Sequence, residues 1–270
     1  MTTAEINPEM QEPYDYYQQA LLEMSSEPLV TNAAGETPWI ASLMVNCDEP
    51  KIVDSFRGAG VLIDPRWVLT CGHAFEDYDR PEEYPKYEDL DPYFRIGGQR
   101  LGTGEVHRFD KVVTNRLRFV TDRTALWGPV NDIALARLCE PADAEPMRIK
   151  DFRGLRIGDR VRGYGWPGGK DGDHQLKQAD TEVIPPQACI GGGPGTGDAC
   201  IANVATAPFG PGYSGGPVFL IPQRETVAEP ILAGVISRGA GSYGDQVLAG
   251  IVTDVTAHLS FIEKTIASTE

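Results

Sequence analysis

Short runs of apolar and β-branched residues recur along most of the chain, each about four to seven residues long. Turn signals separate them, for example Asp64–Pro65 and Gly97–Gly98. Because no helix-period segments lie between these runs, the pattern predicts antiparallel β structure and not alternating βαβ units. The predicted strands are Trp39–Val45, Ala59–Ile63, Trp67–Thr70, Lys111–Thr114, Ile133–Leu138, Arg160–Tyr164, Pro217–Ile221, Ile231–Ile236 and Val247–Val252.

Helical periodicity is found near the two ends of the chain. Within Tyr14–Met24, apolar residues are spaced by four and three, which predicts one short amphipathic helix. From Val255 to Ile266 the apolar spacing is four, three and four, and Asp254 precedes this segment as a candidate N-cap. The pattern therefore predicts a C-terminal helix with one apolar face.

Composition supports a turn-rich β protein and narrows the classes of partner. The 270 residues include 30 glycines and 21 prolines, which is above the usual share. The formal net charge is -15, with 39 acidic and 24 basic residues. Binding to phosphates or to an anionic membrane needs concentrated Lys and Arg, so neither nucleic acid nor a membrane is an expected partner.

The cysteines show no metal-binding motif, and the N-terminus shows no signal-peptide pattern. The five cysteines form no C-x-x-C and, with the histidines, no zinc-site spacing, so we expect no metal and no cofactor. Residues 1–10 have neither a cationic region nor an apolar region like those of a signal peptide. These features favour a cytoplasmic location, although a trimmed secreted or periplasmic chain would look the same.

The segment Gly212–Pro217 carries the clearest chemical signal. Glycines flank Ser214, so its hydroxyl can project while neighbouring backbone N–H groups stay accessible. A serine nucleophile needs a base, and among the four histidines His73 stands where the apolar run Trp67–Thr70 enters a loop. Asp132, just before another apolar run, is a candidate to orient that imidazole.

These blocks resemble the hallmark segments of trypsin-like serine proteases with the chymotrypsin fold, in that family's order of His, Asp and Ser. The resemblance covers about residues 36–268. It implies an all-β fold of two antiparallel six-stranded β-barrels with an N-terminal extension and a C-terminal helix. The expected division is an acidic extension at 1–35, a first barrel at 36–145 with His73 and Asp132, and a second barrel with the helix at 146–270, which carries Ser214.

The resemblance also implies a role for each residue. Ser214 would attack the scissile carbonyl, His73 would accept its proton, and Asp132 would hold the tautomer of His73. The N–H groups of Gly212 and Ser214 would form the oxyanion hole. Ser237 would support Asp132, and the backbone of Ser237, Arg238 and Gly239 would pair with the substrate. The expected reaction is endopeptidase cleavage of a protein or peptide through an acyl-enzyme, and a regulatory partner protein could control it.

Two departures from the family concern activation and disulfides. Tyr213 replaces the Asp that usually pairs with a new N-terminal amine, and Ser25–Val30 lacks the usual Ile-Val-Gly-Gly start. We therefore expect activity without N-terminal cleavage. Gly58 and Ala74 replace the cysteines that usually brace the catalytic His. Cys189 and Cys200 match a family disulfide pair, and they could be bonded or reduced. Cys71 is interpreted as a small packing residue.

Substrate preference depends on residues around the expected specificity pocket. Pro208 occupies the floor position, which does not support a preference for Arg or Lys. Gly239 and Gly250 match wall positions, and Phe209 could fill part of the space. An uncharged, apolar residue before the cleaved bond is therefore expected, while Asp245 in a rim loop keeps a basic preference open.

Two other functions and one surface feature stay open. Gly212–Gly216 also satisfies the G-x-S-x-G elbow of α/β-hydrolases, in which an esterase would use the same Ser. A protease fold could also act as a catalytically silent binding module. The loop Glu76–Asp91 carries eight acidic and two basic residues, and it could be a solvated surface, a rim that attracts basic substrates, or a calcium site.

Overall fold

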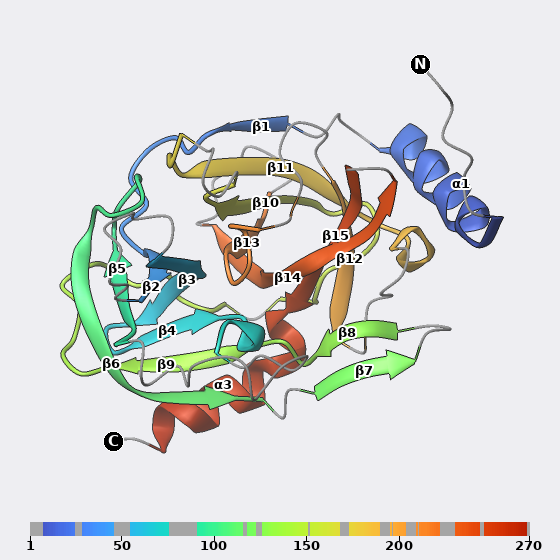
Figure 1. Cartoon of the computed structure of the whole chain (residues 1–270). Helices are drawn as coiled ribbons and strands as arrows, with labels where there is room; N and C mark the ends of the chain where they lie inside the picture. The colour runs from blue at the N-terminus through green and yellow to red at the C-terminus, as the bar shows by residue number, and fades with distance from the viewer. Residues whose placement is uncertain are drawn as a thin grey trace.

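The computed structural model joins two antiparallel β-barrels side by side and has a helix at each end of the chain (Figure 1). The predicted all-β architecture of two six-stranded barrels is confirmed. The structure describes residues 8–24, 29–45, 55–75, 91–115, 118–122, 126–150, 152–167, 173–189, 195, 197–203, 209, 211–221, 230–243 and 246–268.

The first barrel is a closed ring with the strand order β2-β3-β4-β9-β6-β5. Alternate residues of its strands point inward, where Leu43, Leu62, Val68, Phe94 and Ala136 form a fully buried cluster. The strands are β2 (Ile40–Met44), β3 (Phe56–Asp64), β4 (Trp67–Thr70), β5 (Tyr93–Ile96), β6 (Glu105–Thr114) and β9 (Ala134–Leu138).

The second barrel has the order β11-β10-β13-β14-β15-β12, and pairing of β11 with β12 closes the ring. Strand β1 (Leu29–Asn32) adds to its outside by pairing with β11. A separate hairpin is formed by β7 (Arg118–Asp122) and β8 (Leu126–Val130). The barrel strands are β10 (Arg160–Gly165), β11 (Lys177–Ile184), β12 (Asp198–Ala202), β13 (Pro217–Leu220), β14 (Ile231–Tyr243) and β15 (Gln246–Asp254).

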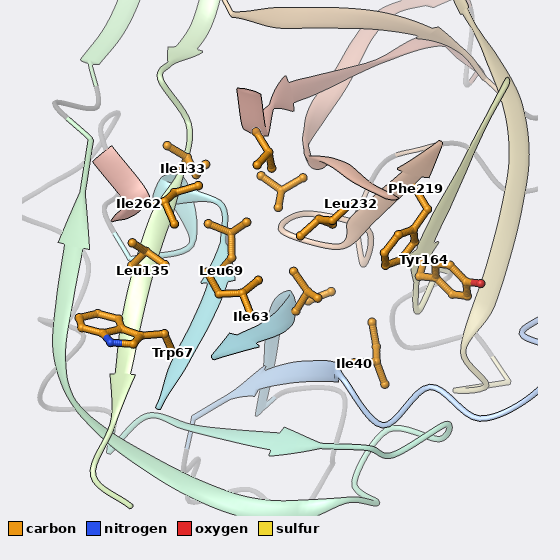
Figure 2. Packing of buried hydrophobic residues seen from close by; sticks show 14 of the residues in the cluster. Ile40, Ile63, Trp67, Leu69, Ile133, Leu135, Tyr164, Phe219, Leu232 and Ile262 are labelled. Atoms are coloured by element: carbon orange, nitrogen blue, oxygen red, sulfur yellow. The ribbon is translucent and has the colours of Figure 1, made fainter. Parts of the chain in front are cut away.

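One apolar cluster spans the junction between the two barrels. Ile40, Leu69 and Ile133 of the first barrel share it with Phe219 and Leu232 of the second, as Figure 2 shows. Burial of each such side chain is worth about 1.5–3 kcal/mol, so the cluster holds the barrels in one relative position. Residues contributed by different barrels can therefore form one site at the junction.

A helix packs at each end of the chain. Helix α1 (Pro8–Glu23) begins earlier than predicted and packs Tyr17 and Ala20 into the same apolar cluster as Cys189 and Cys200 of the second barrel. The C-terminal segment first forms the 3₁₀ turn η5 (Val255–His258) and then α3 (Leu259–Ala267). Asp254 accepts a hydrogen bond from the Thr256 N–H, so it caps the turn as predicted. Among the described helices, none is long and apolar enough to cross a membrane.

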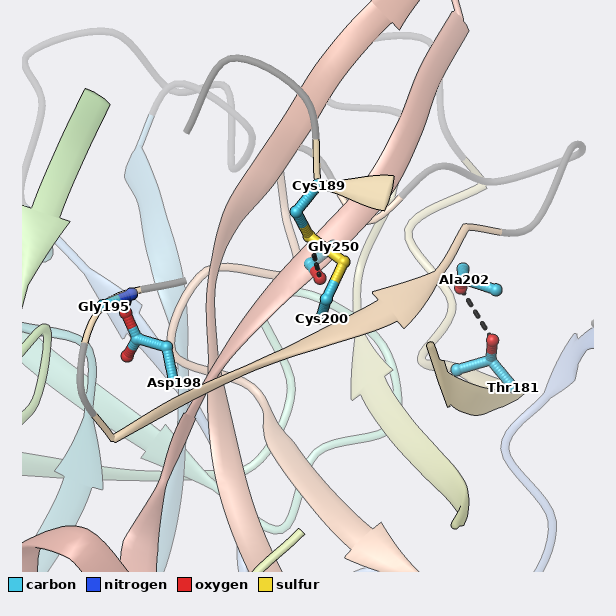
Figure 3. Close-up of a disulfide and its surroundings, with 7 residues drawn as sticks. All are labelled: Thr181, Cys189, Gly195, Asp198, Cys200, Ala202 and Gly250. Carbon is cyan, nitrogen blue, oxygen red and sulfur yellow. Dashed lines mark hydrogen bonds between the residues drawn. A yellow bond between two sulfur atoms is a disulfide. The ribbon is translucent and has the colours of Figure 1, made fainter. Parts of the chain in front are cut away.

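Cys189 and Cys200 form a disulfide in the second barrel (Figure 3). The bond connects Cys189, which follows the short turn η4 (Pro186–Ala188), to Cys200 in β12, across a sequence separation of 11. A loop of this size contributes about 3 kcal/mol in the chain-entropy account of disulfides. The bond therefore anchors β12, which carries Asp198 only two residues earlier.

Candidate active site

His73 follows strand β4, and the pairing of this strand brings Asp132 beside it. All four residues of β4 are buried, and the chain then turns at Gly72–Ala74, which carries His73. Thr70 at the end of β4 pairs with Ala134 at the start of β9. Asp132 lies just before that strand, so the sheet register places the two side chains next to each other.

The Asp132 carboxylate is fully buried and receives three hydrogen bonds. Its Oδ2 lies 2.7 Å from His73 Nδ1, and its Oδ1 accepts the His73 backbone N–H at 2.8 Å. The Ser237 hydroxyl donates to Oδ2 at 2.5 Å. Burial alone would raise the pKa of Asp132, but the charge and hydrogen bonds of His73 together with Ser237 hold it below its usual range. The carboxylate therefore stays ionised and fixes the imidazole with its proton on Nδ1.

His73 is more exposed than its partner, with 30% of its side chain accessible. Burial by itself would lower the pKa of His73, but Cys71 and Asp132 together raise it well above its ordinary value. The imidazole is thus a stronger base than an isolated histidine. Its Nε2 is the atom left to accept a proton.

Ser214 lies in a tight turn that is joined to the first barrel. The Ser214 carbonyl accepts the Ala59 N–H of β3 at 2.7 Å. Gly215 has a φ of +77°, and a Cβ at this position would lie 2.2 Å from Thr70 Oγ1 and 3.1 Å from the Cys71 backbone nitrogen. Only glycine fits such a close approach, so the turn that carries Ser214 is pressed against the residues that lead to His73.

The structure brings these residues together without a direct bond between serine and histidine. Among the described residues, the Ser214 hydroxyl and His73 Nε2 form no hydrogen bond. His73 Nε2 lies instead 3.8 Å from the Cys71 thiol sulfur. A long or absent serine–histidine bond is common in active sites without substrate. Cys71 is therefore a polar neighbour of the imidazole, which the sequence reading of a small packing residue did not anticipate.

Gly212 gives the turn its second unusual conformation. Its φ is +98°, and a Cβ there would lie 2.1 Å from the Trp166 carbonyl oxygen. The Gly212 carbonyl accepts the Trp166 N–H at 2.9 Å, so it points toward the residue that follows β10. Among the described residues, the N–H groups of Gly212 and Ser214 have no acceptor, so both are free to donate a hydrogen bond.

Two further charged residues, Arg238 and Asp198, lie near Ser237. Arg238 Nη1 donates to the Ser237 hydroxyl at 3.1 Å, and burial lowers the pKa of Arg238 against the influence of Asp198 and Asp132. Burial raises the pKa of Asp198 to about 6. Its Oδ2 accepts the Gly195 N–H at 2.9 Å, as Figure 3 shows. Asp198 was not singled out from the sequence, because nothing in its Gly-rich surroundings indicates burial.

The predicted specificity residues lie partly within the described chain. Gly239 of β14 pairs directly with Gly250 of β15, so the two glycines are adjacent. A Cβ on Gly250 would meet Ile201 and Phe209 at 3.0 and 3.1 Å, so the space beside it is already lined by apolar carbons. Pro208, Asp245 and residues 76–90 of the acidic loop lie outside the described residues. The expected apolar preference stays a prediction.

Tyr213, the residue before Ser214, is fully buried in the second barrel. Its ring packs against Phe209 with the centroids 5.1 Å apart. Within the described part of the chain its hydroxyl has no hydrogen-bond partner, and burial raises its pKa. The ring thus fills the space behind the Ser214 turn.

Two substitutions of Tyr213 should have opposite effects on stability. Tyr213→Phe removes an unpaired buried hydroxyl and should raise the free energy of unfolding by about 1 kcal/mol. Tyr213→Ala empties a fully packed site and should lower it by about 3–5 kcal/mol. Urea unfolding followed by circular dichroism measures both values. A Phe variant that is destabilised as much as the Ala variant would mean that the hydroxyl has a partner.

The pH dependence of catalysis should report the raised pKa of His73. The imidazole acts as a base only when Nε2 is unprotonated, so kcat/KM should rise with pH through this pKa. The midpoint of the acidic limb should therefore lie above about 6.5, the ordinary value for histidine. Hydrolysis of a neutral peptide across the pH range measures it.

Asp198 provides the control for this profile, because its pKa of about 6 could also produce a limb. Asp198→Asn should leave the midpoint unchanged. A midpoint at or below about 6.5, or one that moves with Asp198, would contradict the assignment to His73.

The remaining histidines lie away from this arrangement. His258 Nδ1 lies 2.7 Å from the Asn115 amide nitrogen, and His107 Nε2 lies 3.5 Å from a Glu105 carboxylate oxygen. His174 adopts a positive φ of 59° just before Gln175. His73 is thus the histidine placed beside both a buried carboxylate and the Ser214 turn.

Comparison with known proteins agrees with this geometry. A family model described as Trypsin matches residues 30–262. Coagulation factor XII of Cavia porcellus is 28% identical over 235 residues, which is 78% of this chain and 36% of that protein. Transmembrane protease serine 9 of Rattus norvegicus is 26% identical over 250 residues, 86% of this chain and 21% of that protein. The chain thus spans about a fifth to two fifths of the length of these relatives.

A solved structure gives the same view of the fold. The Vibrio cholerae VesB protease superposes with a TM-score of 0.64 at 19% sequence identity, and the match covers 88% of this chain and 67% of that chain. At this identity the likeness concerns the fold alone. The family model extends over most of the chain, and by that match the chain belongs to the trypsin family of serine endopeptidases.

Proposed function

We propose that this chain cleaves peptide bonds of protein substrates through an acyl-enzyme on Ser214, with His73 as the general base and Asp132 as its orienting carboxylate. One observation carries most weight: His73 binds a buried, ionised Asp132 through Nδ1, beside the Gly-rich turn that holds Ser214. An imidazole held in this way has its Nε2 lone pair available for the proton of a nearby hydroxyl.

The steps follow from these positions. Ser214 Oγ attacks the carbonyl carbon while His73 Nε2 takes its proton, and the carbonyl oxygen becomes an oxyanion. The N–H groups of Gly212 and Ser214 donate to that oxyanion, an interaction often worth about 3–4 kcal/mol per donor. His73 then protonates the leaving amine, the C–N bond breaks, and water releases the acyl group by the reverse sequence.

Pre-steady-state hydrolysis of an activated ester and of a peptide tests this proposal. An acyl-enzyme should give a burst of the ester's leaving group equal to the concentration of active sites, and the peptide should also be cleaved. Ester turnover with no cleavage of any peptide in a diverse library would favour the esterase. No turnover of either by the folded protein would favour a binding module.

The surroundings of Ser214 favour the protease over the other two functions. Strand β13, and not a helix, follows Ser214, whereas a nucleophile elbow leads into a helix. The only histidine later in the sequence is His258, which faces Asn115. A silent binding module would have no need for an ionised Asp132 buried against His73.

The proposed enzyme is active without cleavage near its N-terminus. Tyr213 fills the space behind the Ser214 turn with an apolar ring, so no buried carboxylate at this position awaits a new amine. The turn is fixed from other directions by the bonds of Ser214 to β3 and of Gly215 to the Ile236 carbonyl. The oxyanion donors are therefore held in position by the barrels themselves.

Full activity is expected from protein whose sequence is intact through residues 25–38. Intact-mass spectrometry of the assayed sample, together with active-site titration by the ester burst, measures both properties on one preparation. Activity that appears only after a cut between residues 25 and 38 would contradict the expectation. A sample pre-treated with trypsin is the control, and it should show no more active sites per molecule.

For substrate preference, we propose an uncharged, apolar residue before the cleaved bond. The support is the lining of the space beside Gly250 by Ile201 and Phe209. A positional-scanning peptide library tests this preference. Dominant cleavage after Arg or Lys would overturn it.

A further inference from the structure

Cys71 and His73 place a thiol and an imidazole nitrogen together at the proposed active site. The Cys71 sulfur is free and buried, and it lies 3.8 Å from His73 Nε2. Cys71, His73 and Asp132 each offer a donor atom, and these atoms all lie within 4.8 Å of one another. A sulfur and a nitrogen donor at this separation are the ligand types that bind zinc in proteins.

We propose that Cys71 Sγ and His73 Nε2 form a binding site for a borderline-soft divalent cation such as Zn²⁺, and that occupancy of this site reversibly inhibits the protease. The inhibition rests on the function proposed above. The metal binding does not, because it depends only on where the thiol and the imidazole lie.

The separation of the two donors fits one shared ion. Zinc lies about 2.3 Å from a thiolate sulfur and about 2.0–2.1 Å from an imidazole nitrogen. Two donors 3.8 Å apart then subtend an angle of about 120° at the ion, close to the tetrahedral value. The ring of His73 is 30% exposed, so an ion can approach from its side. Water is available for the remaining positions.

Asp132 already supplies the outer support that metal-binding histidines usually have. A ligating imidazole commonly donates its other ring N–H to a carboxylate, which fixes the ring and increases its basicity. Here His73 Nδ1 is bound to Asp132 Oδ2 at 2.7 Å. The arrangement that prepares Nε2 to accept a proton therefore also prepares it to bind a metal.

Metal binding and catalysis compete for one lone pair. On binding, Cys71 releases its thiol proton to solvent and ligates as a thiolate, and His73 ligates through unprotonated Nε2. With the ion bound, Nε2 has no lone pair for the Ser214 proton, so the first step of catalysis stops. Removal of the ion by a chelator restores the base.

Cobalt(II) provides a readout of binding that needs no activity. In the full-length S214A variant, Co²⁺ should bind and produce near-ultraviolet sulfur-to-cobalt charge-transfer absorption. The band should be lost in S214A/C71A and S214A/C71S and retained in S214A/C139A, because Cys139 is an exposed free thiol far from His73 in sequence. A band that persists without Cys71, or is absent with it, would overturn the site.

Inhibition by Zn²⁺ then tests the consequence. Each protein is stripped with chelator, and its rate is expressed relative to its own metal-free rate. Zn²⁺ should inhibit the unaltered protein, and C71A should need at least about 10-fold more Zn²⁺ for half inhibition. C139A should behave like the unaltered protein. Equal sensitivity of C71A would overturn the inhibitory role, whereas a cobalt band in a protein that cleaves nothing would refute only the proposed protease function.

Discussion

Replacing Ser214 by alanine should lower kcat for peptide cleavage by about 10⁶-fold, and replacing His73 by alanine should lower it by a similar factor. Ser214 supplies the attacking oxygen and His73 accepts its proton, so loss of either residue stops the same catalytic step. The S214A/H73A double variant should therefore lose little more than either single variant. Residual activity should come from the oxyanion donors and substrate binding alone.

Steady-state kinetics on one peptide substrate, with circular dichroism to verify folding, measures these losses. Ser260→Ala is the matched control, because Ser260 is exposed on helix α3, and its kcat should be unchanged. A folded S214A variant with more than about a hundredth of the original kcat would mean that another residue is the nucleophile. Losses that multiply in the double variant would mean that the two residues act separately.

Asp132→Asn should lower kcat by about 10⁴-fold while the protein stays folded. The amide oxygen can still accept the His73 backbone N–H. In place of Oδ2, however, the amide has an NH₂ group, which is a donor facing His73 Nδ1 and the Ser237 hydroxyl. The imidazole would then carry its proton on Nε2, where it cannot accept the proton of Ser214. The loss should appear in kcat more than in KM, because substrate contacts are unchanged.

Asp159→Asn is the control for the loss of a buried carboxylate elsewhere. Asp159 is also buried, and it pairs with Arg153 through both of its oxygens. The variant should lose stability but keep its kcat per folded molecule. Equal losses of kcat in both variants would indicate a general structural effect and would contradict the tautomer account.

Strands with a clear local pattern of apolar residues could be predicted from sequence, whereas the mostly polar strand β11 could not. Strand β4 is buried at every residue and was predicted with its observed bounds. Strand β11 was missed, because its first six residues include only one apolar residue, Ala179, and so show no strand pattern. Asp180 of β11 pairs with Arg162 of β10 at 2.5 Å, so its charge is satisfied within the barrel wall. Such pairing depends on strand register, which the local pattern does not contain.

Strand β14 differs from the prediction in another way. Its apolar core at Ile231–Ile236 was predicted, but the strand continues through Gly239 to Tyr243. Glycine weakens the local strand signal, and pairing with β15 supplies the backbone hydrogen bonds that extend it. The extension carries Arg238 and Gly239 alongside Ser237.

Some features of the candidate site could also be predicted from the sequence, and others could not. The order and contexts of His73, Asp132 and Ser214 were readable from the sequence through the family resemblance. The contact of Cys71 with His73 Nε2 was not, because it depends on the local conformation of one turn. The burial of Asp198 near Arg238 was not either, because it arises where two strands distant in sequence come together. The spacing of Cys71 two residues before His73 was visible, but only the turn at Gly72–Ala74 shows that both point to one place.

Labelling with a fluorophosphonate probe tests the central claim most directly. A phosphonate forms a stable bond only to a serine whose proton is removed by a neighbouring base. Peptide mapping of the unaltered protein should place one adduct on Ser214, and the adduct should be lost in folded H73A. An adduct on a different serine, labelling of Ser214 that persists without His73, or no adduct on the folded protein would contradict the account.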